Sequence, residues 1–241
     1  MNRIQMIESS CMKQHRTVRW ATPIAVLFWL GVLGASWAAA DYQPLPLFKM
    51  VATADVIVVG TIAEVDAETF KLTSNQFIQG PAQETFRVKR YVPWNDNGPW
   101  TNDHKGQQLM LFLSKPASTD ASTYLPAYGS TWQIMGAVGE GELPIENQSI
   151  YLGGVFLPGF SRQTYALTGG EITGYRFVRD EFFEAVAQYA KCFQMKKSAG
   201  NTAAVLTKTC SDDTLEQYRQ GSAINRLLVE QSLKALGATQ P

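Results

Sequence analysis

A loop at residues 93–105, with the sequence PWNDNGPWTNDHK, gathers many of the side chains in this chain that could bind a ligand or a metal ion. Asp96, Asp103 and His104 are weak candidates for metal ligands: the two carboxylates are the oxygen donors that calcium prefers, and the histidine adds one nitrogen. The spacing matches no EF-hand loop, which ends in a bidentate glutamate. Asp and Asn in turns mostly bond their own backbone. We therefore assign no metal and no cofactor, and interpret these residues as turn formers.

Aromatic residues in and around the same loop could form a binding platform. Trp94 and Trp100 lie within it, Tyr91 precedes it and Trp132 follows two expected strands later. Such rings could stack on a sugar, a peptide or a partner protein, and a platform requires them to be exposed. Large aromatic residues are more often buried, however, and the alternative is that they fill or cap the core.

The sequence offers no recognisable catalytic set. His104 is the single histidine after residue 40, and Gly159-Phe160-Ser161 lacks the glycine that completes a nucleophile elbow. Zinc-protease, Walker and dinucleotide-binding motifs are missing from the sequence. A non-enzymatic protein is therefore expected.

The alternative is a hydrolase that draws its acid and base from scattered carboxylates such as Asp96, Asp103 or Glu140. It predicts two carboxyl groups in one cleft, at least one of them with a perturbed pKa. Glu140, Glu142 and Glu146 also resemble a carboxylate set, but they lie among glycines beside a proline. A solvated turn is the favoured interpretation of these three glutamates.

The first 40 residues have the pattern of a secretory leader. Basic residues including Lys13 precede an apolar segment at Ile24–Leu33, and Ala38–Ala40 fits a cleavage site. An uncleaved anchor is the alternative, but the apolar run is short of the roughly 20 residues that span a bilayer. The mature chain is expected to be secreted or periplasmic, with no membrane span after cleavage.

Charge and cysteine content agree with export. The leader carries four of the 21 Lys/Arg and one of the 21 Asp/Glu, which leaves 17 basic and 20 acidic residues. Nucleic-acid-binding proteins usually have an excess of basic residues, and this chain has none after the leader. We therefore expect that it does not bind nucleic acid. Cys192 and Cys210 are the two cysteines after the leader and predict one disulfide. A redox or metal pair is the alternative, with no histidine nearby to support it.

The elements that would position these residues are short strands followed by helices. Ala54–Val65 is a β-branched run closed by Gly60 and apolar on both faces at its start, Thr85–Val92 alternates, and Gln107–Leu113 predicts a buried strand. Strands do not alternate with helices, which argues against a parallel α/β sheet. The expected fold is α+β, with a small antiparallel OB-like β-barrel at residues 41–178.

A two-helix hairpin packed on the barrel is expected at residues 179–241. Asp180 is the predicted N-cap of the first helix, whose apolar residues recur at helical spacing from Phe182. Asp213 and Glu216 suggest a capping box for the second helix, which Gly221 weakens or kinks. A polar link at 198–209 would join the two.

Several motifs resemble those of a group of exported bacterial proteins, mostly uncharacterised. They are ADVIVVGTI at 54–62, FIQGP at 77–81, TFRVKRY at 85–91, KGQQLMLFL at 105–113 and WQIMGAVG at 132–139. That group has an OB-like barrel similar to the netrin-like fold of tissue inhibitors of metalloproteinases. In the inhibitors an N-terminal cysteine chelates the target's zinc, whereas this chain has no cysteine between residue 40 and Cys192.

The resemblance implies a fold and does not carry over inhibition. The resulting expectation is an exported protein without catalytic activity that binds another protein or a component of the cell envelope. A carbohydrate- or metal-binding accessory module centred on the 93–105 loop is the alternative from a different class.

Overall fold

The first strand, β1 (Val56–Val65), joins two halves of the fold because both of its faces are buried at its start. Val56 and Val58 belong to one apolar core, whereas Ile57 and Val59 belong to another. The prediction of a strand covered on both sides is confirmed. The strand continues past Gly60, where its pairing shifts register, and a Cβ there would lie 2.4 Å from a backbone oxygen.

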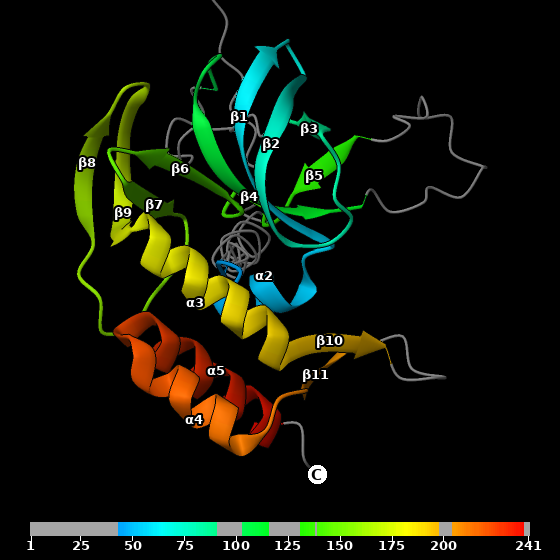
Figure 1. The fold of residues 1–241 in the computed structure, drawn as a ribbon. Coiled ribbons are helices and arrows are strands. Elements are labelled where there is room, and N and C mark those ends of the chain that lie inside the picture. The colour runs from blue at the N-terminus through cyan, green and yellow to red at the C-terminus, as the bar shows by residue number, and fades with distance from the viewer. Residues whose placement is uncertain (1–42, 91–102, 116–130, 138, 198–203, 239–241) are drawn as a thin grey trace, which may run out of the picture. The chain divides into compact units, whose positions relative to one another are not determined.

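The computed structural model describes residues 43–90, 103–115, 131–137, 139–197 and 204–238 (Figure 1). The 1–40 leader therefore lies outside the described residues. Before β1 comes a short helix, α2 (Leu47–Thr53). The strands that follow are β2 (Thr69–Gln79), β3 (Thr85–Lys89), β4 (Gln108–Ser114), β5 (Trp132–Ile134), β6 (Glu142–Glu146), β7 (Ser149–Gly153), β8 (Gln163–Leu167) and β9 (Gly170–Val178).

Five strands close into a barrel in the order β1-β2-β3-β5-β4, with β4 pairing back to β1. The expected all-antiparallel barrel is wrong in one place, since β3 and β5 are parallel. Strand directions cannot alternate all the way round a closed ring of five, so at least one neighbouring pair must be parallel. Among the described residues, one hydrophobic cluster fills its interior: Val56, Val58, Ile62, Phe70, Leu72, Phe86, Val88, Leu109, Leu111, Leu113 and Trp132.

The sheet continues beyond the barrel because the outer edge of β4 has two neighbours. Its last residues, Leu113 and Ser114, pair with β5, whereas Gln108–Leu111 pair with β6. From β6 the sheet extends through β7 and β9 to β8, all antiparallel. The strands after Ser149 therefore extend the sheet and lie outside the barrel ring.

The C-terminal part differs from the predicted two-helix hairpin. It contains α3 (Arg179–Cys192), a β10–β11 hairpin (Phe193–Lys197 and Ala204–Lys208), α4 (Asp212–Gly221) and α5 (Ala223–Ala238). The polar link predicted at 198–209 thus contains one short strand, β11, whereas β10 occupies residues where the first helix was expected to continue. The expected second helix is two helices, because Ser222 is extended and its hydroxyl accepts the Asn225 N–H at 3.2 Å to begin α5.

The helix starts also differ from the predicted caps. α3 is preceded by Val178 in an extended conformation, and Asp180 lies within its first turn. α4 is capped by Ser211, whose hydroxyl accepts the Thr214 N–H at 3.2 Å; Asp213 does not cap it. Both acids still lie in first turns, where the helix dipole favours negative charge.

The helices and the outer faces of β1 and β4 share one core. Phe182, Val186 and Tyr189 of α3 pack in the same cluster as Met110 and Phe112 of β4. Figure 1 shows α3 running between the sheet and the α4–α5 pair. In the described part of the chain, no helix combines the length and apolar character needed to cross a bilayer.

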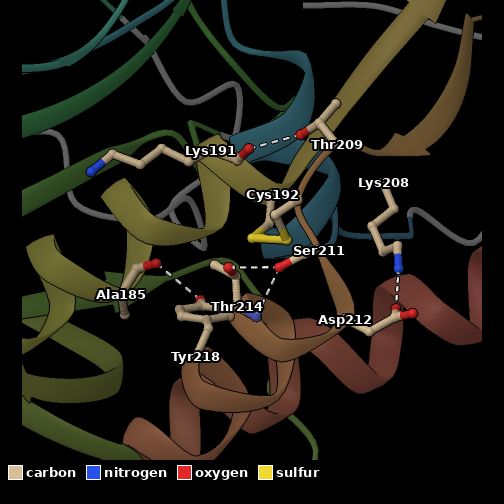
Figure 2. The surroundings of a disulfide bond; sticks show 10 residues. Ala185, Lys191, Cys192, Lys208, Thr209, Ser211, Asp212, Thr214 and Tyr218 are labelled. Atoms are coloured by element: carbon tan, nitrogen blue, oxygen red, sulfur yellow. Dashed lines mark hydrogen bonds and ion pairs between the residues drawn. A yellow bond between two sulfur atoms is a disulfide. The ribbon is translucent and has the colours of Figure 1, made fainter.

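The predicted disulfide is confirmed. Cys192, the last residue of α3, is bonded to Cys210, which follows β11 (Figure 2). Thr209 supports the bond from both of its polar groups: its N–H donates to the Cys192 carbonyl at 2.8 Å, and its hydroxyl donates to the Lys191 carbonyl at 2.7 Å. The disulfide therefore closes the β10–β11 hairpin at its base.

Candidate functional site

The aromatic platform loses one of its expected members. Trp132 is only 7% exposed and lies inside the barrel, with its ring 5.9 Å from that of Phe86 in an edge-on contact. For Trp132 the interpretation that the ring fills the core is confirmed, and its proposed place in an exposed platform is wrong. Tyr91, Trp94 and Trp100, like Asp96, lie outside the described residues.

An ion pair joins the two described ends of the loop. Arg90 Nε, just after β3, donates to Asp103 Oδ2 at 2.7 Å, and the Asp103 side chain is only 1% exposed. Arg90 is fixed further by its N–H, which donates to the Glu68 carbonyl, and by Nη1, which donates to the Asp66 carbonyl at 3.1 Å. The chain is thus anchored on both sides of residues 91–102.

A second carboxyl group faces this ion pair. Glu142, the first residue of β6, is 6% exposed and interacts directly with Asp103. Burial raises the pKa of Glu142 well above its usual range and the negative charge of Asp103 raises it further, whereas Arg90 acts in the opposite direction. Glu142 is therefore held in its neutral form over a wider pH range than an exposed glutamate.

The hydrogen bonding of these two carboxyl groups requires a proton. Asp103 Oδ1 and Glu142 Oε1 are both buried, and neither has a donor within the described residues. Two ionised carboxylates can only accept, so they cannot satisfy one another. A proton on Glu142 supplies a donor between them. With that proton on Glu142, a carboxylic acid would lie beside the Asp103 carboxylate that pairs with the Arg90 guanidinium.

The interpretation of the three glutamates as a solvated turn is wrong for Glu140 and Glu142, whereas Glu146 is partly exposed beside the β6–β7 turn. Glu142 is buried as described, and Glu140 is 1% exposed, with its Oε1 accepting the Leu45 N–H at 3.1 Å. The neighbouring glycines make room for that side chain, since a Cβ at Gly136 would come within 1.9 Å of Glu140 Oε2. Glycine-rich sequence here marks close packing around buried acids.

A hollow of about 400 Å³ lies beside the C-terminal end of the loop. Three turns form its walls: the segment before β4, the β6–β7 turn and the β8–β9 turn. Its lining residues are His104, Lys105, Gly106, Gln107, Gln108, Pro144, Ile145, Glu146, Asn147, Leu167 and Thr168. The volume is within the range of small-ligand sites.

Hydrogen bonds hold each wall of this hollow in place. In the first wall, the His104 N–H donates to Gln107 Oε1 at 3.2 Å, and the Gly106 N–H donates to the Ile62 carbonyl at 2.8 Å. Gly106 has φ +89°, a conformation that suits glycine. The second and third walls are joined, since Glu146 accepts the Thr168 hydroxyl at 2.5 Å and its N–H at 3.1 Å.

The hollow is lined by both hydrogen-bond donors and hydrogen-bond acceptors. The amides of Gln108 and Asn147 can each bond a polar ligand, while Pro144 and Leu167 provide apolar contact. Gln107 is 6% exposed, and its Nε2 has no acceptor within the described residues. Such a set suits an uncharged, hydrogen-bonding ligand better than a polyanion.

A second hollow, of about 380 Å³, lies on the outer face of β1–β3, but its charged groups are already paired. Lys71 Nζ lies 3.6 Å from Glu64 Oε1, and Arg87 Nη2 lies 3.6 Å from Asp66 Oδ2. Hydrogen bonds from the Thr69 hydroxyl and N–H lower the pKa of Asp66. This face is therefore well solvated and internally satisfied.

Among the described residues, no group of three or more His, Cys, Asp or Glu side chains converges to hold a metal ion. Asp103, one of the weak candidates, is already occupied by Arg90 and Glu142. Sequence reasoning missed Arg90 and Gln107. The opposite charges of Arg90 and Asp103 at the two ends of one loop were the available signal.

Comparison with known proteins gives little to add. No family model and no curated protein matches the chain. A solved structure described as an exosome complex RNA-binding protein aligns with 9% identity over 83% of this chain and 100% of that chain, with a TM-score of 0.24. A TM-score this low carries no argument about fold or function.

Proposed function

We propose that this chain is an exported, non-enzymatic binding protein that takes another protein or a cell-envelope component into the hollow beside the 93–105 loop. The observation that carries the proposal is a hollow of about 400 Å³ whose three walls are each fixed by hydrogen bonds. Preformed walls lower the cost of ordering on binding, which favours a binding role. Export is supported by the leader pattern and the disulfide.

The barrel supports the same proposal. Its strand order, with a single parallel pair between β3 and β5, is compatible with an OB-like barrel. OB-like barrels are known for binding ligands at strand faces and in flanking loops. The proposed hollow uses such a position, since His104–Gln107 lead directly into β4. The likeness to netrin-like proteins is part of this proposal.

The lining predicts what kind of contact the ligand makes. Lys105 and Glu146 bring opposite charges, so the hollow has no strong preference for an ion of either sign. Amide groups beside proline and leucine suit the backbone and small side chains of a peptide segment. We therefore favour a protein partner over a nucleic acid, whose phosphates would need a basic surface.

The test fills the hollow and measures binding. Mature wild-type chain and the variants Lys105→Glu and Gln108→Trp are immobilised and exposed to an envelope extract of the producing cells and to a panel of oligosaccharides. Lys234→Glu, an equal charge change at an exposed position of α5, is the matched control. We expect one partner to be retained by wild type and by Lys234→Glu and lost from both hollow variants. Equal retention by all four proteins would contradict the proposal.

A carboxylate-based hydrolase is the second candidate, because two carboxyl groups converge at Asp103 and Glu142 and one has a raised pKa. Their burial weighs against it, since neither side chain lines either hollow described above. This candidate would be favoured over the binding role if the wild-type chain shows glycosidase or peptidase activity and if Asp103→Asn and Glu142→Gln each abolish it.

A carbohydrate-binding module is distinguished by the same panel. Oligosaccharide binding that quenches tryptophan fluorescence and survives Gln108→Trp would locate the ligand at the 93–105 loop and away from the hollow.

A further inference from the structure

Three charged side chains meet where the barrel and the extended sheet separate. Arg90 comes from the end of β3, Asp103 from the segment before β4, and Glu142 from the start of β6. Glu142 lies opposite Leu111 on β4, on the edge that β5 has just left. The cluster therefore connects three parts of the chain that no continuous strand pairing joins at this point.

We propose that this cluster is a proton-operated tie, which holds the 103–107 segment against the barrel while Asp103 and Glu142 share one proton and releases it when that proton is lost. The proposal does not depend on what the neighbouring hollow binds. It assigns a conformational role to Arg90, Asp103 and Glu142, which do not line the hollow proposed for binding.

The charge balance of the cluster supports this role. With the proton in place, the positive charge of Arg90 faces one negative charge on Asp103, and Glu142 is neutral. Without it, two carboxylates with 1% and 6% exposure face each other across one guanidinium. Buried like charges repel strongly, and their buried oxygens, Asp103 Oδ1 and Glu142 Oε1, would both lack a donor within the described residues.

Other charged groups do not replace the missing proton. On the described elements around Glu142, the charges that act on its carboxyl group are Asp103 and Arg90. The next cation along β3, Arg87, is paired with Asp66 and hydrogen bonded to Thr69. The raised pKa of Glu142 agrees with the geometry, because it means that the proton is retained beyond the usual carboxyl range.

The part that responds is the short segment after Asp103. Two hydrogen bonds join it to β1: Gly106 N–H to the Ile62 carbonyl, and Ile62 N–H to the Gln107 carbonyl. Two more lie within the segment, His104 N–H to Gln107 Oε1 and Gln107 N–H to the His104 carbonyl. Displacement of Asp103 pulls directly on His104. Since the same segment forms one wall of the hollow, deprotonation also changes the shape of that wall.

The test is amide hydrogen exchange by NMR on the mature chain over a pH series, with intrinsic exchange rates divided out. We expect protection at His104, Gly106 and Arg90 to fall at least tenfold as pH rises through the Glu142 titration. Thr209, whose N–H bonds to the Cys192 carbonyl beside the disulfide, is expected to stay constant. The carboxyl carbon of Glu142 is followed in the same samples.

Two variants isolate the proton. Glu142→Gln keeps the shape and a permanent donor toward Asp103, so protection is expected to stay high at every pH. Glu64→Gln, a matched change at a side chain that is 73% exposed, is expected to keep the wild-type pH dependence. A Glu142→Gln variant with the wild-type pH dependence would overturn the proposal. So would a wild-type Glu142 that titrates at the ordinary value, a result that needs no variant.

Discussion

Two segments of this protein are tied at their ends in different ways. Cys192 and Cys210 close the β10–β11 hairpin with a covalent bond, whereas Arg90 and Asp103 meet across residues 91–102 through an ion pair. A disulfide carries no titratable group and breaks only by reduction. A buried ion pair beside a second carboxyl depends on protonation and is indifferent to reductant. The chemistry of each tie therefore determines the signal that can release it.

The surroundings of the two ties also differ. Around the disulfide, Thr209 satisfies the carbonyls of Lys191 and Cys192, as Figure 2 shows for the hydroxyl contact. Around the ion pair, Asp103 Oδ1 and Glu142 Oε1 lack a donor within the described residues unless a proton is shared. At the disulfide these carbonyls are hydrogen bonded whatever the pH. At the ion pair the buried carboxyl oxygens are hydrogen bonded only when the cluster carries a proton.

The largest effect is expected from removing the disulfide. Replacing both Cys192 and Cys210 with alanine should lower the free energy of unfolding by about 3 kcal/mol, because the unfolded chain gains entropy. Urea denaturation followed by circular dichroism measures the loss. Reductant should weaken the wild type similarly and leave the double variant unchanged. An identical urea midpoint for wild type and variant would show that the disulfide contributes nothing.

Breaking the ion pair should cost somewhat less. Arg90→Gln leaves the Asp103 carboxylate buried without its cation, which should lower the free energy of unfolding by about 2 kcal/mol at neutral pH. Urea denaturation at constant pH measures the difference. If the variant unfolds at the wild-type urea concentration, Arg90 is not needed to stabilise Asp103.

A variant that no longer needs the proton on Glu142 should have a higher free energy of unfolding than wild type at high pH. Because the folded-state pKa of Glu142 is raised, the stability it contributes is full below the unfolded-state value and is lost as pH rises through the folded-state value. Glu142→Gln should therefore match wild type at acidic pH and become more stable by roughly 1 kcal/mol or more above the titration. Thermal unfolding over a pH series measures the difference. A variant less stable than wild type at high pH would contradict the assignment.

The smallest effect on stability is expected for an exposed ion pair, which serves as a comparison for the buried one. Lys71 and Glu64 form an ion pair at 3.6 Å with side chains 46% and 73% exposed. Lys71→Gln should change the free energy of unfolding by less than about 0.5 kcal/mol, since solvent already screens the pair. Measured beside Arg90→Gln under the same conditions, it separates the effect of a buried charge from that of charge alone.

The sequence was most informative where one element determines its own pattern. The alternation over Thr85–Lys89 and the apolar run in β4 needed no partner to be recognised as strands. The disulfide followed from there being two cysteines after a predicted secretory leader. α3 was located by its helical periodicity, although its start differs from the predicted cap.

The candidate site could not be predicted because it depends on closure of the barrel. Asp103 and Glu142 are far apart in sequence and meet only because β6 replaces β5 beside β4. Glutamates among glycines have the composition of an exposed turn, and only tertiary packing buries them. The β10–β11 strands were missed for a similar reason, since their short sequences, half polar and half apolar, become strands by pairing with each other above the disulfide.

The most direct test of the two-tie account is amide exchange measured at Gly106 and Thr209 in one sample of the mature chain. Each amide reports one tie, through bonds to Ile62 and Cys192 respectively. The account predicts that raising the pH lowers protection at Gly106 and leaves Thr209 unchanged, and that reductant does the reverse. If both amides lose protection together under either treatment, the two ties are not independent and the account is contradicted.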